Sequence, residues 1–157
     1  MEEMLFKQLQ FVRDHTLKVM AGVTEEMADI TPEGFNNTIR WNLGHIYFVL
    51  EVFAFEKNEL PTKMPEDFSK LFAPGTSTAD WEDTTLPTIN ELTLLLQDQQ
   101  GRIKATLENH LHENSKNPIV TKSGLKLVTV AEFLNFNLFH EGVHVSTIKL
   151  YKKLLEK

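Results

Sequence analysis

The chain has 157 residues, of which 41% are hydrophobic and 24% charged, and eleven are phenylalanine. These proportions are typical of a folded globular protein, exclude a largely disordered chain and predict one domain over residues 1–157. The net charge of −6 repels phosphate groups, so nucleic acid is disfavoured as a partner.

The chain contains no cysteine, which excludes disulfides, thiolate metal ligands and a cysteine nucleophile. It opens with MEEMLFKQLQ, where acidic residues replace the positive charge of a secretory segment. No apolar run is long enough to span a bilayer. We therefore expect a soluble, cytoplasmic protein without a membrane partner.

Helical periodicity dominates the first third of the chain. Residues 2–21 form a first amphipathic helix, with an apolar stripe at Leu5, Leu9, Val12, Leu17 and Met20. The triplet Thr31-Pro32-Glu33 indicates a cap and the first residue of one short helical turn. Asn36 or Asn37 then caps a second long helix, over about 38–57.

A long connection follows over residues 58–85. It is interrupted by prolines, and we expect short helical turns in it near 66–71 and 78–83. A capping box from Thr88 to Glu91 opens a third helix that extends to about residue 111. The segment NPIVTKSGLKLV predicts a small hairpin, and a second capping box, from Thr129 to Glu132, opens the last helix, to about residue 155.

Four long helices predict an all-α four-helix bundle. The short first link makes helices one and two antiparallel, the long crossover lets helix three run parallel to helix two, and the last turn reverses the direction again. The expected order is up-down-down-up, so helices two and four are antiparallel.

Three histidines in this arrangement indicate a metal site. His140 and His144 share one face of the last helix, and His45 lies in the apolar second helix. On antiparallel helices with a rise of about 1.5 Å per residue, all three reach roughly mid-height. Three protein ligands leave one coordination position open, as in catalytic zinc sites. The alternative is three separate core histidines with local hydrogen bonds.

The other histidines and several polar residues are weaker candidates for the metal site. His15, His110 and His112 lie in ordinary polar surroundings. Asn42 and Asn137 each precede a candidate ligand by three residues, and either side chain can orient an imidazole, bind substrate or be a half-buried helix polar group. Several aromatic residues are candidates for the pocket wall, although as a set they fit a core better than a cofactor pocket: Trp41, Phe48, Phe133, Phe136 and Tyr151.

Three segments together resemble the DinB/YfiT-like superfamily of metal-dependent enzymes: NTIRWNLGHIYFVLE, TKSGLKLVTVAEFL and NLFHEGVHVSTIKLYKKLL. The resemblance covers essentially the whole chain. It implies an up-down-down-up bundle, a divalent cation, zinc or nickel, on His45, His140 and His144, and frequent homodimers. Apolar residues beyond one inward stripe, such as Phe53, Phe55 and Phe139, also favour a dimer.

For some members the resemblance implies transfer or isomerisation chemistry with low-molecular-weight thiols such as bacillithiol or mycothiol. Many members carry a second adjacent histidine and an Arg-Gly-Gln after the last ligand, whereas this chain reads HEGVHVSTI. That departure leaves the three candidate ligands in place. We expect a transferase or hydrolase that acts on a small molecule together with a low-molecular-weight thiol. The alternative is a non-catalytic interaction or metal-binding protein.

The sequence His140-Glu141-x-x-His144 also matches the zinc-protease motif, in which the glutamate is a general base. Only Glu156 follows as a further carboxylate, and no strand is available to align a peptide, so proteolysis is disfavoured. Glu141 remains a candidate acid–base group or a partner of a ligand, against the alternative of a solvated helix residue.

Overall fold

The computed structural model describes residues 2–81 and 84–156. Its helices and strands follow one another as α1 (Glu2–Val19), α2 (Glu25–Ala28), α3 (Ile39–Ala54), the 3-10 turn η1 (Glu56–Asn58), α4 (Phe68–Phe72), the 3-10 turn η2 (Thr78–Asp80), α5 (Ile89–Leu107), β1 (Asn114–Val120), β2 (Lys126–Thr129) and α6 (Val130–Leu155). The fold is mostly helical, with one small sheet. Within the described residues no helix is both long and apolar enough to cross a membrane.

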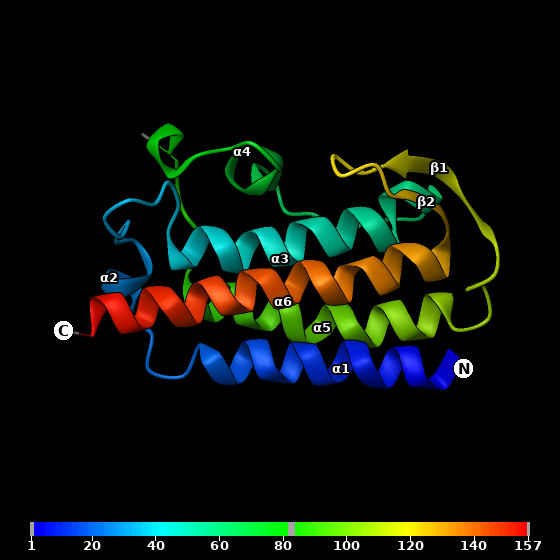
Figure 1. Ribbon diagram of the computed structural model, residues 1–157, viewed down its shortest axis with the longest axis horizontal. Coiled ribbons are helices and arrows are strands. Elements are labelled where there is room, and N and C mark those ends of the chain that lie inside the picture. Colours follow the sequence, from blue (N-terminus) through cyan, green and yellow to red (C-terminus); the bar gives the residue numbers. More distant parts are fainter. Residues whose placement is uncertain (1, 82–83, 157) are drawn as a thin grey trace.

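The four long helices lie side by side, and α6 lies between α3 and α1 in the view of Figure 1. The colours show that α1 and α6 begin at one end of the bundle, whereas α3 and α5 begin at the other. Helices α3 and α6 therefore run in opposite directions along their shared contact. All three candidate ligands belong to these two helices: His45 to α3, and His140 and His144 to α6.

Both predicted capping boxes are present. The Thr88 and Thr129 hydroxyls accept from the third residue of α5 and α6, and the glutamate at each third position accepts from the backbone N–H of its cap. The last helix ends where it was expected, at Leu155, whereas α5 ends at Leu107, four residues early.

Two other expected caps are wrong. The short helix lies before Thr31, because the Thr24 hydroxyl accepts from the Met27 N–H and starts α2 there. The chain after Pro32 forms only a turn, which closes between the Phe35 N–H and the Pro32 carbonyl. Thr38, rather than Asn36 or Asn37, caps α3 by accepting from the Trp41 N–H.

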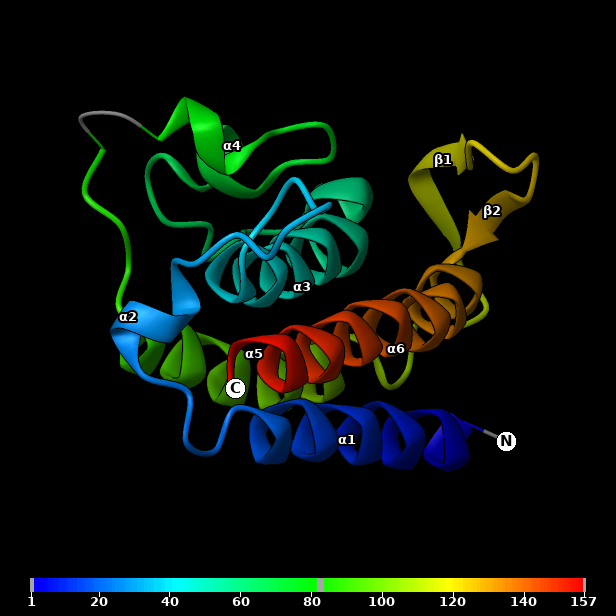
Figure 2. The same ribbon diagram turned by 60° about the vertical axis from the view of Figure 1, so that its left-hand side comes forward.

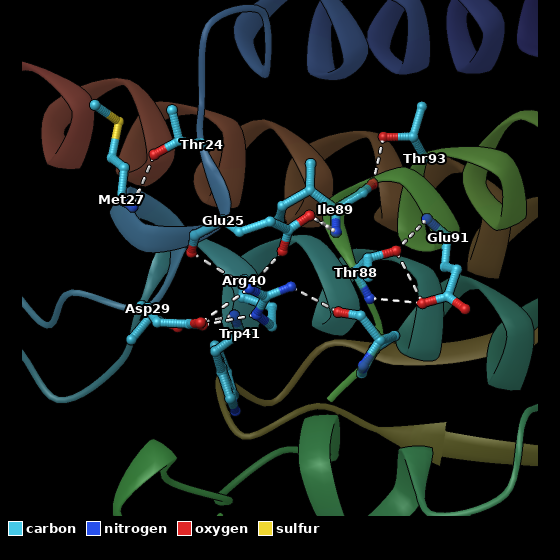
Figure 3. A network of polar contacts seen from close by, with 12 residues as sticks. Thr24, Glu25, Met27, Asp29, Arg40, Trp41, Thr88, Ile89, Glu91 and Thr93 are labelled. Atoms are coloured by element: carbon cyan, nitrogen blue, oxygen red, sulfur yellow. Dashed lines mark hydrogen bonds and ion pairs between the residues drawn. The ribbon is translucent and has the colours of Figure 1, made fainter. Parts of the chain in front are cut away.

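The segment before α3 is fastened to the bundle by the buried guanidinium of Arg40 (Figure 3). It binds both oxygens of Asp29, at 2.7 and 2.9 Å, and the Glu25 carboxylate at 2.7 Å. It also donates to the carbonyl of Pro87, and the second oxygen of Glu25 accepts from the Ile89 N–H. Arg40 and Glu25 thereby join α2, α3 and the start of α5.

The long connection and the hairpin both lie on the α3 side of the bundle (Figure 2). The first expected turn is α4, and the second is η2; residues 82 and 83, where the second was expected to end, lie outside the described part of the chain. The expected hairpin is formed by antiparallel β1 and β2 and turns through Gly124, whose φ of 88° suits glycine.

The apolar core has one cluster near each end of the bundle, and polar side chains fill the layer between these two. The first includes Met20, Leu96 and Ile148, and the second includes Leu9, Ile103 and Leu134. A third cluster, Val49, Phe53, Leu127 and Phe133, joins the hairpin to α3 and α6. The expected stripe on α1 was partly wrong: Arg13 and Thr16 take fully buried inner positions, whereas Val12 and Leu17 are only half-buried.

The polar layer connects the four long helices through charged pairs. Arg13 of α1 binds Glu141 of α6 through two contacts, at 2.8 and 3.1 Å, and both side chains are about 1% exposed. Gln99 of α5 accepts from Arg13 and donates to the buried Glu51 of α3, which also binds Arg102. Removing any member therefore leaves a buried charge or polar group without its partner.

We predict that Arg13→Met lowers the free energy of unfolding by about 3–5 kcal/mol, because the Glu141 carboxylate stays buried without its counter-ion. Urea denaturation measures the change. Adding Glu141→Leu should recover much of the loss, since no buried charge then remains. Lys7→Ala, which breaks an exposed pair with Glu3, is the control and should change little. If Arg13→Met alone is as stable as the unmodified chain, the stabilising role of the Arg13–Glu141 pair is contradicted.

Candidate metal centre

Antiparallel packing of α3 against α6 brings His45, His140 and His144 together. One candidate ligand atom from each lies within 4.8 Å of the other two. The Nε2 atoms of His45 and His140 are 3.2 Å apart, close to the roughly 3.3 Å between two nitrogens that share a tetrahedral zinc at about 2.05 Å. His45 is buried, whereas the other two rings are half-buried, so one side of the cluster approaches the surface.

His45 is oriented by the crossover. Its Nδ1 lies 2.6 Å from the carbonyl of Phe72, the last residue of α4. A carbonyl only accepts, so Nδ1 carries the proton and Nε2 keeps its lone pair. The indole of Trp41 stacks on the imidazole with ring centres 4.5 Å apart, and its Nε1 donates to the Thr76 hydroxyl. Trp41 therefore lies directly against one of the three candidate ligands.

Gly44 explains why the Phe72 carbonyl can reach the imidazole. A Cβ at this position would overlap the Phe72 ring, which is fully buried. The glycine lets α4 approach α3 closely, at the cost of a residue that weakens helices. The sequence signal for this contact is a glycine directly before His45 in an apolar helix, and no prediction was drawn from it.

His144 is oriented by Asn42. Its Nδ1 lies 2.8 Å from Asn42 Oδ1, and the Asn42 amide nitrogen donates to the Thr38 carbonyl. The second contact fixes which end of the amide faces the imidazole, so His144 Nδ1 donates and Nε2 is left to bind a ligand. The structure thus places Asn42 against His144 of the facing helix, whereas its spacing in the sequence had associated it with His45.

Asn137 and Glu141 face the interior of the bundle. The Asn137 amide donates to Glu141 Oε2 at 3.4 Å, and its Oδ1 has no partner among the described residues. Glu141 is 1% exposed, so the solvated alternative is wrong. Its carboxylate accepts from Arg13 and from the Thr16 hydroxyl, at 2.6 Å for the latter. Glu141 follows His140 by one residue and is rotated about 100° around the helix from it.

Burial keeps the histidine cluster uncharged. It lowers the pKa of His140 to about 3, with a further contribution from His45, and it lowers the pKa of His144 to about 3 together with both neighbouring rings. Burial also lowers the pKa of His45, partly offset by the Phe72 carbonyl. Neutral imidazoles are the metal-binding form, so near pH 7 an ion meets three ligands that need not lose a proton.

Three further expectations concern residues at a distance from the cluster. Tyr151, a candidate pocket residue, is buried in the core and packs edge-on against Phe35, with ring centres 4.8 Å apart. Phe133 is also buried, against Phe53. His110 pairs with Glu113 at the surface and belongs to no cluster with the three histidines.

The donor set fits a divalent cation of borderline softness. All three side chains offer nitrogen, and two of them direct Nε2 inward because a fixed acceptor holds Nδ1. The third, His140, has a buried Nδ1 without a partner among the described residues. Three nitrogen ligands leave room for a further ligand on the half-buried side.

Comparisons with known proteins identify the fold and the family of this chain. The solved structure of a protein from Streptococcus pneumoniae resembles this one with a TM-score of 0.60 over 98% of this chain and 91% of that chain; at 17% identity, the likeness shows a shared fold. No curated protein matches the sequence. The family model of the DinB superfamily matches residues 8–148, which is most of the chain. The chain therefore belongs to the DinB superfamily.

Proposed function

We propose that this protein is a divalent-metal-dependent enzyme in which His45, His140 and His144 hold zinc or nickel through Nε2. The observation that carries the proposal is the convergence of the three side chains from antiparallel helices, with nitrogen atoms within 4.8 Å of one another. A bound cation of this kind lowers the pKa of water or accepts a thiolate. The chain supplies no cysteine, so any thiol is a diffusible cosubstrate.

The residues around the proposed ion have separate tasks. Asn42 and the Phe72 carbonyl hold two imidazoles in the tautomer and orientation that binding needs. Trp41 covers one face of His45 and excludes water from it. Glu141 holds α6 against α1, since its oxygens already accept from Arg13 and Thr16.

The first test of the proposal is metal content. After dialysis against zinc and then against metal-free buffer, the protein should retain about one ion per chain, bound in the three-ligand manner of catalytic zinc sites. His144→Ala should lose most of it, because two imidazoles hold zinc weakly. His112→Ala changes an exposed histidine outside the cluster and serves as the control. Equal zinc in the protein and in His144→Ala would refute the three-histidine site.

The second test concerns the reaction class, a transferase or hydrolase that acts on a small molecule with a thiol. The cobalt-substituted protein should change its visible absorption when 2-mercaptoethanol is added, because sulfur enters the open position. Ethylene glycol, which lacks the thiol, is the matched control and should leave the spectrum unchanged. If several small thiols leave the spectrum unaltered, the non-catalytic alternative, a metal-binding or interaction protein, replaces the thiol-dependent enzyme.

The proposed assembly is a homodimer, but two residues that favoured it are core residues: Phe53 and Phe55 are buried. Phe139 is 67% exposed, and Val143 and Leu150 on the same helix are also exposed. Their spacing by four and seven residues puts them on one face of α6. This apolar face supports self-association through α6.

We predict that Phe139→Glu shifts the protein toward a monomer in sedimentation velocity at micromolar concentration, because a charge would then be buried in the interface. Leu125→Glu, which changes an exposed leucine beside the hairpin turn, should leave the dimer intact. A single 18.1 kDa species for the unmodified protein would contradict the dimer.

A further inference from the structure

A cavity lies between the crossover and α5. Its volume is about 610 Å³, which is within the range of small-molecule sites. Phe68 and Leu71 of α4 form one side, and Leu94 and Leu95 of α5 form another. Further lining residues come from the chain on either side of α4: Lys63, Pro65, Glu66, Asp67, Thr85, Leu86 and Pro87, with Glu91 and Asp98 from α5.

The walls of this cavity are held by buried groups, so its shape exists before any ligand binds. At one edge the backbone of Lys63 is fixed twice: its carbonyl accepts from the Tyr47 hydroxyl at 2.8 Å, and its N–H donates to Glu51 at 2.7 Å. At the other edge Arg40 binds the carbonyl of Pro87 at 2.6 Å (Figure 3). A preformed site saves a ligand the cost of ordering its walls.

The third wall, α4, is also fixed. Phe68 packs edge-on against Tyr47 and Phe72, and the Trp81 indole donates to the carbonyl of Leu71. The cavity lining is mainly apolar, and Leu94 remains 56% exposed beside it. An exposed leucine next to apolar walls gives an organic ligand surface to cover.

The rim of the cavity is acidic. Four carboxylates line it, Glu66, Asp67, Glu91 and Asp98, against one lysine, Lys63. Asp98 pairs with Lys63 and with Arg102, whose guanidinium also binds Glu51, and Asp67 pairs with Lys70 outside the lining. Among the described residues, Glu66 and Glu91 have no salt bridge, so the rim keeps an excess of negative charge.

We propose that this cavity is a binding site for a small amphiphilic organic cation, such as an alkyl- or arylammonium. The apolar part contacts Phe68, Leu71 and Leu95, and the ammonium lies at the rim near Glu66 and Glu91. The site is separate from the histidine cluster: α4 stands between them, with Phe68 and Leu71 facing the cavity and the Phe72 carbonyl binding His45. This inference goes beyond the proposed metal-dependent reaction and does not depend on it.

Three probes of matched size test the charge preference: 4-phenylbutylammonium, 4-phenylbutan-1-ol and 4-phenylbutanoate. Each is titrated into the full-length ¹⁵N-labelled protein and followed by amide shifts. We expect the ammonium to bind about fivefold tighter than the alcohol, the ratio given by about 1 kcal/mol from exposed charge pairs, and the carboxylate to bind most weakly. The largest shifts should fall on Leu71, Leu94 and Leu95.

Two variants and one control locate the site. Leu94→Gln removes apolar surface at an exposed position and should weaken all the probes that bind, while Glu66→Gln should reduce the preference for the ammonium over the alcohol. Leu125→Gln, a similar change beside the hairpin turn, should alter neither. Equal affinity for the three probes, shifts centred on His140 and His144, or unchanged binding by Leu94→Gln would each overturn the proposal.

Discussion

The buried polar layer is the constraint on which the rest of the structure depends. It joins Glu141, Arg13, Gln99 and Glu51 in one chain of contacts across all four long helices. A shift of one helical turn would leave buried carboxylates and a buried guanidinium unpaired, whereas apolar side chains could repack in another register without leaving a polar group unpaired. The layer therefore fixes the position of each long helix along its axis relative to its neighbours. Glu141 lies between His140 and His144 in the sequence, so its pairing with Arg13 also sets the height of both candidate ligands opposite His45.

The histidine cluster needs contacts from outside the bundle as well. His144 is oriented from α3 by Asn42, whereas His45 is oriented from the crossover by the Phe72 carbonyl. Gly44 lies where the crossover contacts the bundle, because the absence of its side chain lets α4 lie directly on α3. The crossover is thus part of the site's construction and does more than join two helices.

The sequence predicted what depends on local spacing and missed what depends on tertiary contact. The i,i+4 pair His140 and His144 and both capping boxes follow from helix geometry, and the structure contains them. The inward position of Arg13 did not follow, because apolar neighbours at Val12 and Leu17 fit the same helical period. Backbone acceptors such as the Phe72 carbonyl carry no sequence signal at all; only the glycine beside His45 indicated that another segment approaches there.

Without a bound ion, the histidine cluster destabilises the folded protein, and a bound ion would offset this cost. At 3.2 Å, one of the two facing Nε2 atoms donates to the other. His45 carries its proton on Nδ1, so the donor is His140, and its Nδ1 is then buried with no described partner. A fold selected for stability alone would favour an apolar side chain there. If the His140 proton passes to Nδ1, the imidazole stays neutral and both Nε2 atoms are free to bind an ion. Such an ion would stabilise the folded chain, since the unfolded chain has no such site.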